Sequence, residues 1–587
     1  LIKKFVKDKT SILLADNYFN LANALSEFEL LDEALDYYDS AANLVRKIHG
    51  EYSEYMASII SNKSGIYVLM NNFEEAIDLN EQSYRIKQKT LPPNDLAFIF
   101  YYYNTAYIFL ERNESEEDNL IALENLDRCM QVYRNAHSPD PYYLVYTYYA
   151  FVQAYKNLKK YDVAKTYLQK AIDLNIKMYG EDFEERGYVL QIMGDIYLGE
   201  GALEKARDEL QASIHFYKTY ISTEIKALAD SYGLLGDLYS KQNKHKEALQ
   251  SYQHAMYYFF PALDTNNFFI NPRLDDFYSE KYFLELLSKK AVTLRKYYEK
   301  NTDPQALQAS LDTYLLLAQY VKLSRKGFYG GSHSTLNFAE RTTRFYEEGI
   351  ETALMLFKLN QDKSYLWKAF TLSDNRRYGL LLEELQQVRK RTYSNVPAEI
   401  TRQEQNLTST INFIQHQLIE LKAQSPEEKN VAQIHALEDK IYHLKADYAT
   451  LAKAVEIQYP SYYQLKFSDE NLSVENLSAS LNKGDLLLEY FIGTRSLYLF
   501  IISSETLNFL EIPKEDHFSN TIQGFLESVR NRDFKTYTTA AYTLYRQFLK
   551  PALKDEKLAG KSSHHLIIIP DAGMGYTPFE TLIQRPP

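Results

Sequence analysis

The clearest signature in the chain is Leu235-Gly236-Asp237-Leu238-Tyr239, which is followed by Ala248 and Tyr252. The same residue classes occur 42 residues earlier, as Met193-Gly194-Asp195-Ile196-Tyr197 followed by Ala206. A glycine on one helix that faces an alanine on the next lets the two helices approach closely, while leucine and tyrosine fill the remaining space. The pattern therefore predicts a helical hairpin that occurs more than once.

The alanine of this hairpin recurs through the first 260 residues. It is found as Ala34, Ala76, Ala122, Ala164, Ala206 and Ala248, at steps of 42, 46, 42, 42 and 42. A fixed period of this length is the signature of a solenoid in which each repeat packs on its neighbours. The longer step contains an acidic insertion, Glu114 to Asp118, which we expect to form a protruding loop between two helices.

This pattern resembles the tetratricopeptide repeat in its long, 42-residue form. About six repeats, within residues 1–260, imply an α-solenoid whose first helices line a concave groove. Asn20, Asn62 and Asn104 share one position of the first helix. An amide can pair with the backbone of an extended peptide, and a similarity to kinesin-light-chain-like arrays favours this use. The alternative is that these amides only bridge adjacent repeats.

Helical patterning continues through residues 261–395 without the fixed period, which predicts further helical repeats or a helical linker. The segment from Gly330 to Ser334 lacks the lysine of a phosphate-binding loop and the context of a nucleophile elbow, so we interpret it as a loop between helices. Two heptad runs occupy residues 396–457, separated by a polar connector. They predict an antiparallel, coiled-coil-like hairpin, with a coil between two chains as the alternative.

Residues 458–587 change to mixed strands and helices. Predicted strands lie at 485–492, 496–503, 506–512 and 565–570, and predicted helices at about 518–530 and 536–553. The apolar run Leu566-Ile567-Ile568-Ile569 predicts a last strand that is buried on both faces of a parallel sheet. The fold class is therefore mainly α, with an α-solenoid, a helical hairpin and the beginning of an α/β domain. Because the chain begins at Leu1 and stops soon after this strand, we expect a fragment.

Parts of this C-terminal region resemble the CHAT family, caspase-like domains associated with tetratricopeptide repeats. The resemblance is carried by the helix at 370–385, the strand segment 487–493, and the segments 566–571 and 578–582. It implies a cysteine peptidase in which a histidine activates a cysteine thiolate, with both residues beyond this chain. No catalytic residue is assigned here.

We expect several polar residues of the same region to have structural rather than catalytic roles. The arginines of the 370–385 helix, Arg376 and Arg377, are expected at the surface, and Glu580 is expected to make a structural contact. His565 precedes the apolar run of its strand and does not match the catalytic histidine that the resemblance implies. Asp571 follows the same strand, at an edge where α/β sites often lie.

Composition narrows the class of function. A formal charge of −12 and a pI near 5.6 provide no basic surface for nucleic acid. No apolar run is long enough to span a membrane, and no metal-ligand spacing or cofactor fingerprint is present. The single cysteine, Cys129, fits a buried packing role and favours a reducing, cytoplasmic location. The 52 tyrosines are interpreted as packing residues.

These features together predict a repeat groove that recognises a peptide or protein and regulates a caspase-like cysteine peptidase module. The alternative is a non-catalytic scaffold for protein–protein interaction. A third hypothesis is a sensor kinase, which needs an ATP-binding domain after residue 587. The sequence leaves open whether the protein is an enzyme and which oligomeric state it adopts.

Overall fold

The computed structural model describes residues 12–27, 30–93, 95–136, 140–181, 183–221, 225–273, 281–325, 335–389, 398–423, 430–459, 474–514, 518–554, 565–571, 574–575 and 577–582. The chain divides into two compact bodies. The array body comprises Leu1–Thr302, Tyr320–Phe338 and Lys390–Tyr463. The sheet body comprises Asp303–Gln319, Ala339–Arg389 and Gln464–Pro587.

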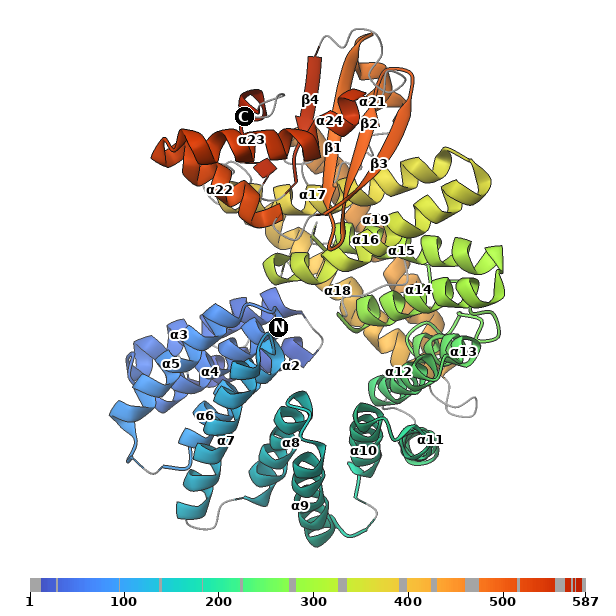
Figure 1. Ribbon diagram of the computed structural model, residues 1–587. Helices are drawn as coiled ribbons and strands as arrows, with labels where there is room; N and C mark the ends of the chain where they lie inside the picture. The colour runs from blue at the N-terminus through green and yellow to red at the C-terminus, as the bar shows by residue number, and fades with distance from the viewer. Residues whose placement is uncertain are drawn as a thin grey trace. The chain divides into compact units, whose positions relative to one another are not determined.

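The N-terminal part of the array body is a succession of helical hairpins (Figure 1). The first helices of the hairpins are α2 (Ile12–Glu27), α4 (Glu54–Leu69), α6 (Phe98–Arg112), α8 (Pro141–Asn157), α10 (Arg186–Glu200) and α12 (Ile225–Lys241). The second helices are α3 (Leu31–His49), α5 (Phe73–Thr90), α7 (Glu116–Asn135), α9 (Tyr161–Tyr179), α11 (Leu203–Tyr220) and α13 (His245–Tyr257). Each of α3, α5, α7, α9 and α11 contacts the first helix of its own hairpin and the first helix of the next, as in a solenoid.

Small residues bring the two helices of each hairpin together. The recurring alanines are all fully buried, at 0% exposure: Ala34, Ala76, Ala122, Ala164, Ala206 and Ala248. On the first helices, a Cβ added to Gly194 would lie 2.7 Å from Leu210 Cγ, and one added to Gly236 would lie 2.4 Å from Tyr252 Cε1. These distances are too short for any side chain, so the helices approach closely at these glycines, but the side chain that faces each glycine is Leu210 or Tyr252 rather than the predicted alanine.

A residue with positive φ ends the first helix in five of the described hairpins. These residues are Asn71, Asn113, Lys159, Gly201 and Asn243, with φ between 40° and 82°. The left-handed conformation is a common way to end a helix and reverse the chain. In four hairpins it lies five residues before the recurring alanine, and in the third it lies nine residues before Ala122. The insertion is therefore located between these two points.

The insertion does not form the protruding loop that the sequence predicted. α7 begins six residues before Ala122, whereas the other second helices begin three residues before their alanine, so the insertion adds nearly one turn to α7. Ser115 caps this turn by accepting a hydrogen bond from Asp118 N at 3.3 Å, and three acidic residues occupy the first turn. The buried Asp118 also pairs with Arg112 at 2.5 Å. A capped, acidic N-terminus stabilises a helix, which explains why the insertion is helical.

The array body continues beyond the repeats with α14 (Lys281–Asn301) and with α18 (Ala398–Ala423) and α19 (Val431–Gln458). Glu404 near the start of α18 accepts a hydrogen bond from Tyr448 Oη near the end of α19 at 3.4 Å, so the two helices run antiparallel. α15 (Pro304–Arg325) and α16 (Thr335–Asn360) are each divided between the two bodies. The predicted loop from Gly330 to Ser334 lies outside the described residues.

The sheet body contains a small mixed sheet. Its strands are β1 (Asp485–Ile492), β2 (Ser496–Ile502), β3 (Leu507–Pro513) and β4 (His565–Ile569), in the order β3-β2-β1-β4. β1 pairs antiparallel with β2, with Leu488 opposite Ile501, and β2 pairs antiparallel with β3. β4 pairs parallel with β1, with Ile567 opposite Leu487. The parallel pairing requires a crossover, and the helices between β3 and β4 provide it.

Helices cover both faces of this sheet. The crossover contains α22 (Phe518–Asn531), α23 (Phe534–Phe548) and the short α24 (Lys550–Lys554), and Phe525, Leu544 and Phe548 from it pack on Leu488 and Leu499. The other face contacts α17 (Ser364–Arg389), where the Phe370 and Phe500 ring centroids are 5.8 Å apart. α21 (Val474–Ser480) precedes β1, and a short 3-10 helix, η3 (Phe579–Thr581), follows β4.

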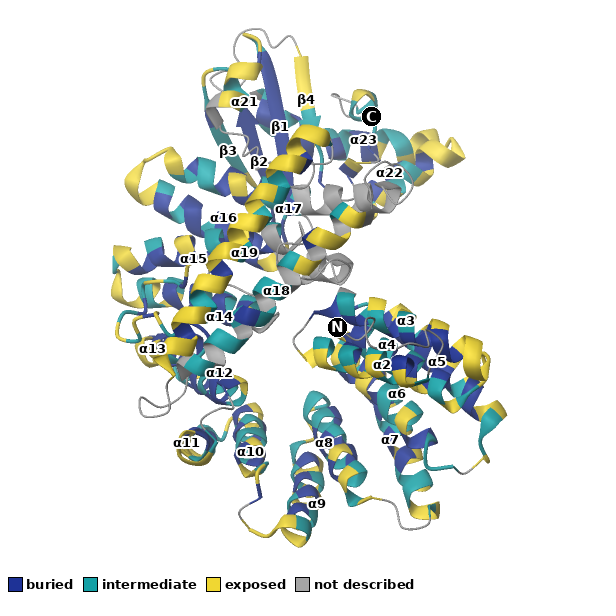
Figure 2. Cartoon of the chain, turned by 180° about the vertical axis from the view of Figure 1, so that it is seen from behind, coloured by how far each residue is buried: buried dark blue, intermediate teal, exposed yellow. Residues whose placement is uncertain are grey.

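β4 differs from its prediction. The apolar run predicted a strand buried on both faces, but β4 has only one neighbour among the described strands, and Leu566 and Ile567 are 39% and 41% exposed. Figure 2 shows the contrast between β1, which is buried, and β4, which carries exposed residues. The prediction of burial was wrong because an apolar run indicates what a strand can bury and does not determine how many neighbours it has.

Candidate functional site

Tyrosines from three consecutive first helices line a cleft of about 670 Å³ in the array body. We call this the tyrosine cleft. Tyr103 and Tyr107 come from α6, Tyr146 and Tyr149 from α8, and Tyr188 from α10. The solenoid places these helices side by side, because α6 contacts α8 and α9 contacts both α8 and α10. Side chains that are far apart in the sequence therefore form one aromatic surface.

The rings of the tyrosine cleft support one another while leaving part of their surface open. Tyr149 is 8% exposed, packs edge-on against Tyr188 at 5.3 Å and Tyr146 at 6.2 Å, and accepts a hydrogen bond from Asn175 Nδ2 at 3.1 Å. Tyr107, Tyr146 and Tyr188 are between 36% and 42% exposed. The interpretation of the tyrosines as packing residues is therefore incomplete, since these three present part of their ring surface to the cleft.

Carboxylates accompany the rings. Glu111, Glu184 and Glu185 line the tyrosine cleft, and its ammonium group, Lys156, is paired with Asp195 at 2.6 Å. Burial and the nearby Glu111 raise the pKa of Tyr107. The phenols of the cleft are thus neutral hydrogen-bond donors at physiological pH, and the residues that line the cleft carry a net negative charge.

A second hollow, of about 260 Å³, is formed by α10, α12 and α14. It contains Asp195, Asp230, Glu285 and Lys289. Lys289 pairs with Glu285 at 2.8 Å and with Asp237 at 2.9 Å. Because Asp195 lines this hollow and also binds Lys156 of the tyrosine cleft, the two sites share an acidic boundary.

The predicted asparagine ladder is placed on the first helices of the first three hairpins. Asn62 Nδ2 donates to Asn23 Oδ1 at 2.9 Å, and Asn104 Nδ2 donates to Ser61 Oγ at 2.9 Å. Each bond joins one first helix to the preceding first helix. Asn20 is exposed. Asn62 and Asn104 therefore bridge adjacent repeats, as one hypothesis stated, and the role of the three asparagines in peptide binding stays a prediction.

Cys129 lies inside the third hairpin. It is 1% exposed, its Sγ lies 3.6 Å from the carbonyl oxygen of Ile99, and burial raises the pKa of the thiol. A buried thiol with a raised pKa is a poor nucleophile. The packing role expected for this cysteine agrees with its surroundings.

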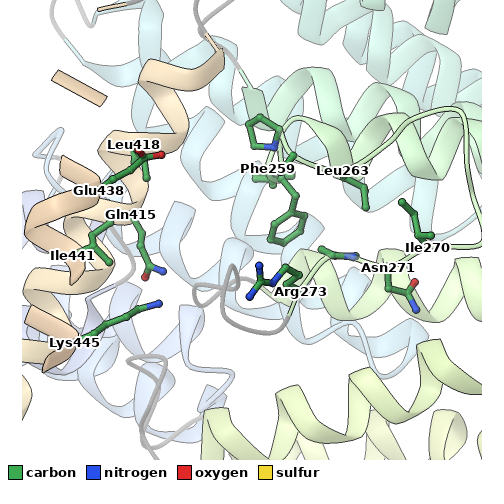
Figure 3. A pocket seen from close by; sticks show the side chains of 14 residues that line it. Phe259, Leu263, Ile270, Asn271, Arg273, Gln415, Leu418, Glu438, Ile441 and Lys445 are labelled. Carbon is green, nitrogen blue, oxygen red and sulfur yellow. The ribbon is translucent and has the colours of Figure 1, made fainter. Parts of the chain in front are cut away.

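An apolar pocket of about 440 Å³ lies between the loop after α13 and the α18–α19 pair (Figure 3). Phe259, Leu263 and Ile270 contribute from the loop, while Leu418 and Ile441 contribute from the helices. These side chains offer a hydrophobic surface within the array body.

A buried lysine holds the loop side of this pocket in place. Lys290 of α14 is 0% exposed, and its Nζ donates to Gln253 Oε1, Ile270 O and Asn271 Oδ1 at 3.0, 2.5 and 3.0 Å. Gln253 Nε2 in turn donates to the carbonyl oxygens of Asp264 and Asn267. Burial lowers the pKa of Lys290 to about 7. Its three acceptors satisfy every donor of the ammonium group, which indicates a structural clamp.

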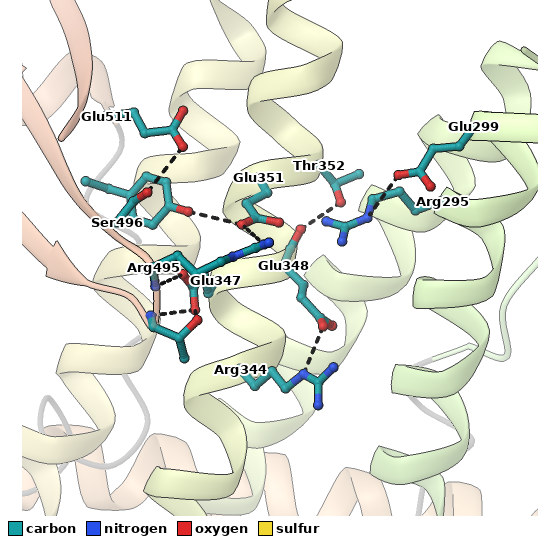
Figure 4. Close-up of polar contacts among 12 residues, drawn as sticks. Arg295, Glu299, Arg344, Glu347, Glu348, Glu351, Thr352, Arg495, Ser496 and Glu511 are labelled. Atoms are coloured by element: carbon teal, nitrogen blue, oxygen red, sulfur yellow. Dashed lines mark hydrogen bonds and ion pairs between the residues drawn. The ribbon is translucent and has the colours of Figure 1, made fainter. Parts of the chain in front are cut away.

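Carboxylates in the sheet body anchor α16 to the turn between β1 and β2 (Figure 4). Glu347 accepts hydrogen bonds from Thr494 N and Thr494 Oγ1, both at 2.8 Å. Glu351 pairs with Arg495 at 2.8 Å and accepts from Tyr498 Oη at 3.3 Å. The turn consists of Gly493, Thr494 and Arg495, and these partners give it a structural role.

Two consecutive arginines of α17 form ion pairs with buried carboxylates, and Arg376 is itself buried while Arg377 is partly exposed, which corrects their predicted surface location. Arg376 pairs with Asp571 at 2.6 Å, and the same carboxylate accepts a hydrogen bond from the backbone N–H of Ile492 at 2.7 Å. Arg377 pairs with Glu489 of β1, which is 1% exposed. The sequence suggested surface positions for these two side chains because arginine is usually solvated, but a sheet that supplies buried carboxylates reverses that preference.

Other titratable residues of the sheet body lie in different surroundings. Burial raises the pKa of Glu489 to about 7, although Arg377 and a hydrogen bond from Ser373 oppose the shift. Glu580, which was expected to make a structural contact, is exposed in η3. His565 pairs with Asp485 at 3.0 Å at the start of β4. The single cysteine of the chain, Cys129, lies in the array body.

Comparisons with known proteins locate the repeats. A tetratricopeptide-repeat family model matches residues 12–89, and a second tetratricopeptide-repeat model matches residues 145–175 and 229–258. The chain therefore contains tetratricopeptide repeats within these matched residues. A CHAT family match is not among these findings.

Two curated proteins are similar in sequence to part of this chain. A clustered mitochondria protein homolog from Debaryomyces hansenii is 22% identical over 272 residues, which is 43% of this chain and 20% of the relative. A homolog of the same name from Candida albicans is 32% identical over 82 residues, which is 14% of this chain and 6% of the relative. The chain thus spans a fifth or less of the length of these relatives. The crystal structure of apo RapI is similar at a TM-score of 0.37 and 11% identity, covering 63% of this chain and 98% of RapI.

None of the described helices combines the length and apolar character that crossing a lipid bilayer requires.

Proposed function

We propose that the protein binds an extended segment of a partner protein along the first helices of its repeat array, centred on the tyrosine cleft. The observation that supports this most directly is a hollow of about 670 Å³ lined by part-exposed tyrosines from three consecutive repeats. Aromatic rings with polar tips are enriched at binding sites, and an extended chain can contact several consecutive repeats at once. The tetratricopeptide repeats themselves support a role in protein–protein interaction.

Selection of random peptides by display on the purified chain tests this function. The peptides that are enriched are then added to the chain, and amide hydrogen exchange is measured by mass spectrometry. We expect protection in α6, α8 and α10, because a bound segment shields the inner side of these helices. Protection restricted to helices outside these three would contradict the assignment of the cleft.

The asparagines provide a separate test within the same function. If the ladder of Asn20, Asn62 and Asn104 also contacts the bound segment, Asn62→Ala and Asn104→Ala each weaken binding by about 1–3 kcal/mol, because a partner group loses its hydrogen bond. Each change also removes a bond between repeats, so thermal melting of both variants is measured in parallel. Unchanged affinity in both variants would restrict the asparagines to bridging repeats.

A second candidate function is regulation of a caspase-like cysteine peptidase of the CHAT type by the repeat array. It is supported by the sheet body, in which β4 runs parallel to β1 next to an antiparallel hairpin, with helices on both faces. The test is hydrolysis of a fluorogenic peptide mixture by the protein expressed from its natural gene, with and without a display-selected peptide. Equal, background-level hydrolysis in both samples would leave the interaction role alone.

A further inference from the structure

We propose that the tyrosine cleft takes a lysine or arginine side chain of the partner segment, held against the phenol rings and beside the carboxylates of Glu111 and Glu185. This inference rests on the proposed function and specifies the chemistry of the partner. The cleft therefore selects cationic segments rather than acidic or uncharged ones.

The charge of the inner surface supports a cationic ligand. Six carboxylates and two ammonium groups line the tyrosine cleft and the adjoining hollow, namely Glu111, Glu184, Glu185, Asp195, Asp230 and Glu285 with Lys156 and Lys289. Both ammonium groups are already paired, Lys156 with Asp195 at 2.6 Å and Lys289 with Asp237 at 2.9 Å. Within the part of the chain that the structure describes, no Lys or Arg pairs with Glu111, Glu184 or Glu185.

The rings supply a second attraction. A cation within about 6 Å of an aromatic ring centroid is attracted by the negative face of the ring. Among the described residues, no Lys or Arg occupies that position over the rings of Tyr103, Tyr107, Tyr146, Tyr149 or Tyr188, although Tyr107, Tyr146 and Tyr188 are more than a third exposed.

The array already uses this contact elsewhere. Lys170 Nζ lies 4.3 Å from the ring centroid of Tyr167, and Lys89 Nζ lies 3.9 Å from that of Tyr52. The cleft offers the same kind of ring without a cation of its own, so a cation from a partner completes the arrangement.

Other ligand classes fit less well. An acidic segment would bring like charges close to Glu111 and Glu185, which opposes association. A purely apolar segment would cover the rings but would also remove water from these carboxylates without replacing its hydrogen bonds, which costs free energy. A cationic side chain with an aliphatic stem satisfies both parts of the site, because the stem packs on the rings and the charged end reaches the carboxylates.

The test uses the display-selected peptides and two matched pairs of variants. Tyr146→Leu keeps an apolar side chain but removes the ring, whereas Tyr146→Phe keeps the ring and removes the hydroxyl. Tyr188→Leu and Tyr188→Phe form a second, independent pair on another helix. Affinities are measured by fluorescence anisotropy with a labelled selected peptide, after thermal melts have shown that each variant is folded.

We expect the enriched peptides to contain lysine or arginine. Each Leu variant should weaken binding by about five-fold, while each Phe variant stays within about two-fold of the parent. The double variant Glu111→Gln with Glu185→Gln should weaken binding at low salt and reduce its salt dependence, since fewer charges remain to be screened.

The outcomes separate this inference from the proposed function. Selected peptides without lysine or arginine that still protect α6, α8 and α10 would overturn the cationic partner while keeping peptide recognition. Equal binding by the Leu and Phe members of both pairs would have the same meaning. A selection that enriches no peptide protecting these helices would overturn both.

Discussion

Single glycines set the distance between helices in the array. At Gly236 an added Cβ would lie 2.4 Å from the ring of Tyr252, whereas at Gly65 of α4 an added Cβ would meet no atom within 4 Å. Tyr252 cannot move away freely, because it is 1% exposed and donates a hydrogen bond to Asp237 at 2.7 Å. The two glycines therefore have opposite expected responses to the same substitution.

Gly236→Ala should lower the free energy of unfolding of the array body by about 1–3 kcal/mol, because the packed ring has to shift. Gly65→Ala is the matched control, and it should raise stability by up to about 1 kcal/mol, because alanine is the better helix former. Denaturant titration followed by far-UV circular dichroism measures both. Equal effects of the two substitutions would show that Tyr252 does not limit the approach of the helices.

The buried carboxyl of Glu489 predicts a pH dependence of stability. Its pKa is raised to about 7 in the folded protein and is near 4.3 when unfolded. The folded state therefore binds the proton more tightly, so this contribution is complete below about pH 4 and is lost as the pH rises to about 7. The expected loss is at most about 4 kcal/mol.

Glu489→Gln is the control for that pH dependence, since glutamine does not titrate. The difference in unfolding free energy between parent and variant, measured at several values between pH 4.5 and 7.5, should change in favour of the variant as the pH rises. A constant difference across this range would mean that Arg377 holds Glu489 charged throughout.

The sequence identified which side chains could take part in binding or ion pairing, but it did not show whether each of them is buried or exposed. Tyr103 and Tyr149 occupy equivalent repeat positions 46 residues apart, and Tyr146 and Tyr188 do so 42 residues apart. That recurrence could have predicted the cleft, but tyrosine serves both cores and surfaces, and the period does not show which. Arg376 and Arg377 were misplaced because their acidic partners are more than a hundred residues away in the sequence.

At the level of elements, the start of α7 shows how local sequence decides a boundary. Ser115 and the acidic first turn convert an insertion into helix, and Asp118 joins this turn to Arg112 of α6. The charge of the insertion suggested an exposed loop, but the same residues are also a favourable helix N-terminus.

Ser115→Ala should destabilise the first turn of α7 by about 1 kcal/mol, because the N–H of Asp118 loses its acceptor. Hydrogen exchange at residues 116–119 should accelerate by roughly five-fold. Ser40→Ala is the control, since Ser40 is within α3 and its hydroxyl bonds only to the carbonyl of Asp36. Unchanged exchange in α7 would indicate that the Arg112–Asp118 pair suffices to hold the turn.

Strand positions could be predicted from the sequence, but strand neighbours could not. β1 lies at the predicted residues 485–492, and β2 and β3 agree within one residue at their ends. Each short apolar run limited by turn residues is a local signal. The exposure of Leu566 and Ile567 in β4 depends on the arrangement of the whole sheet, which no local run encodes.

At the level of the whole molecule, two bodies with separate hydrophobic cores should unfold in separable steps. The chain contains one tryptophan, Trp367, and it lies in α17 of the sheet body, 5.9 Å from Phe370. Its fluorescence therefore reports on the sheet body, while far-UV circular dichroism is dominated by the helices of the array.

Gly236→Ala should shift the circular dichroism transition and leave the Trp367 transition in place. Leu499→Ala should do the reverse, with a loss of about 2–5 kcal/mol in the sheet body, because Leu499 is 0% exposed. Both signals are recorded in the same denaturant titration. If each variant moves both transitions together, the two bodies unfold as one cooperative system.

The added turn of α7 indicates that a repeat can be lengthened inside a helix only by about a whole turn. Three of the four extra residues lengthen α7 and the fourth lies in the connection before it; three residues are close to the 3.6 residues of one α-helical turn, and Ala122 stays fully buried. Two extra residues would instead rotate the following side chains by about 200° and turn the alanine away from its partner helix. Repeat lengths of 42 and 46 residues are thus both compatible with a buried alanine. A repeat of 44 residues would need its two extra residues in a connection rather than in a helix.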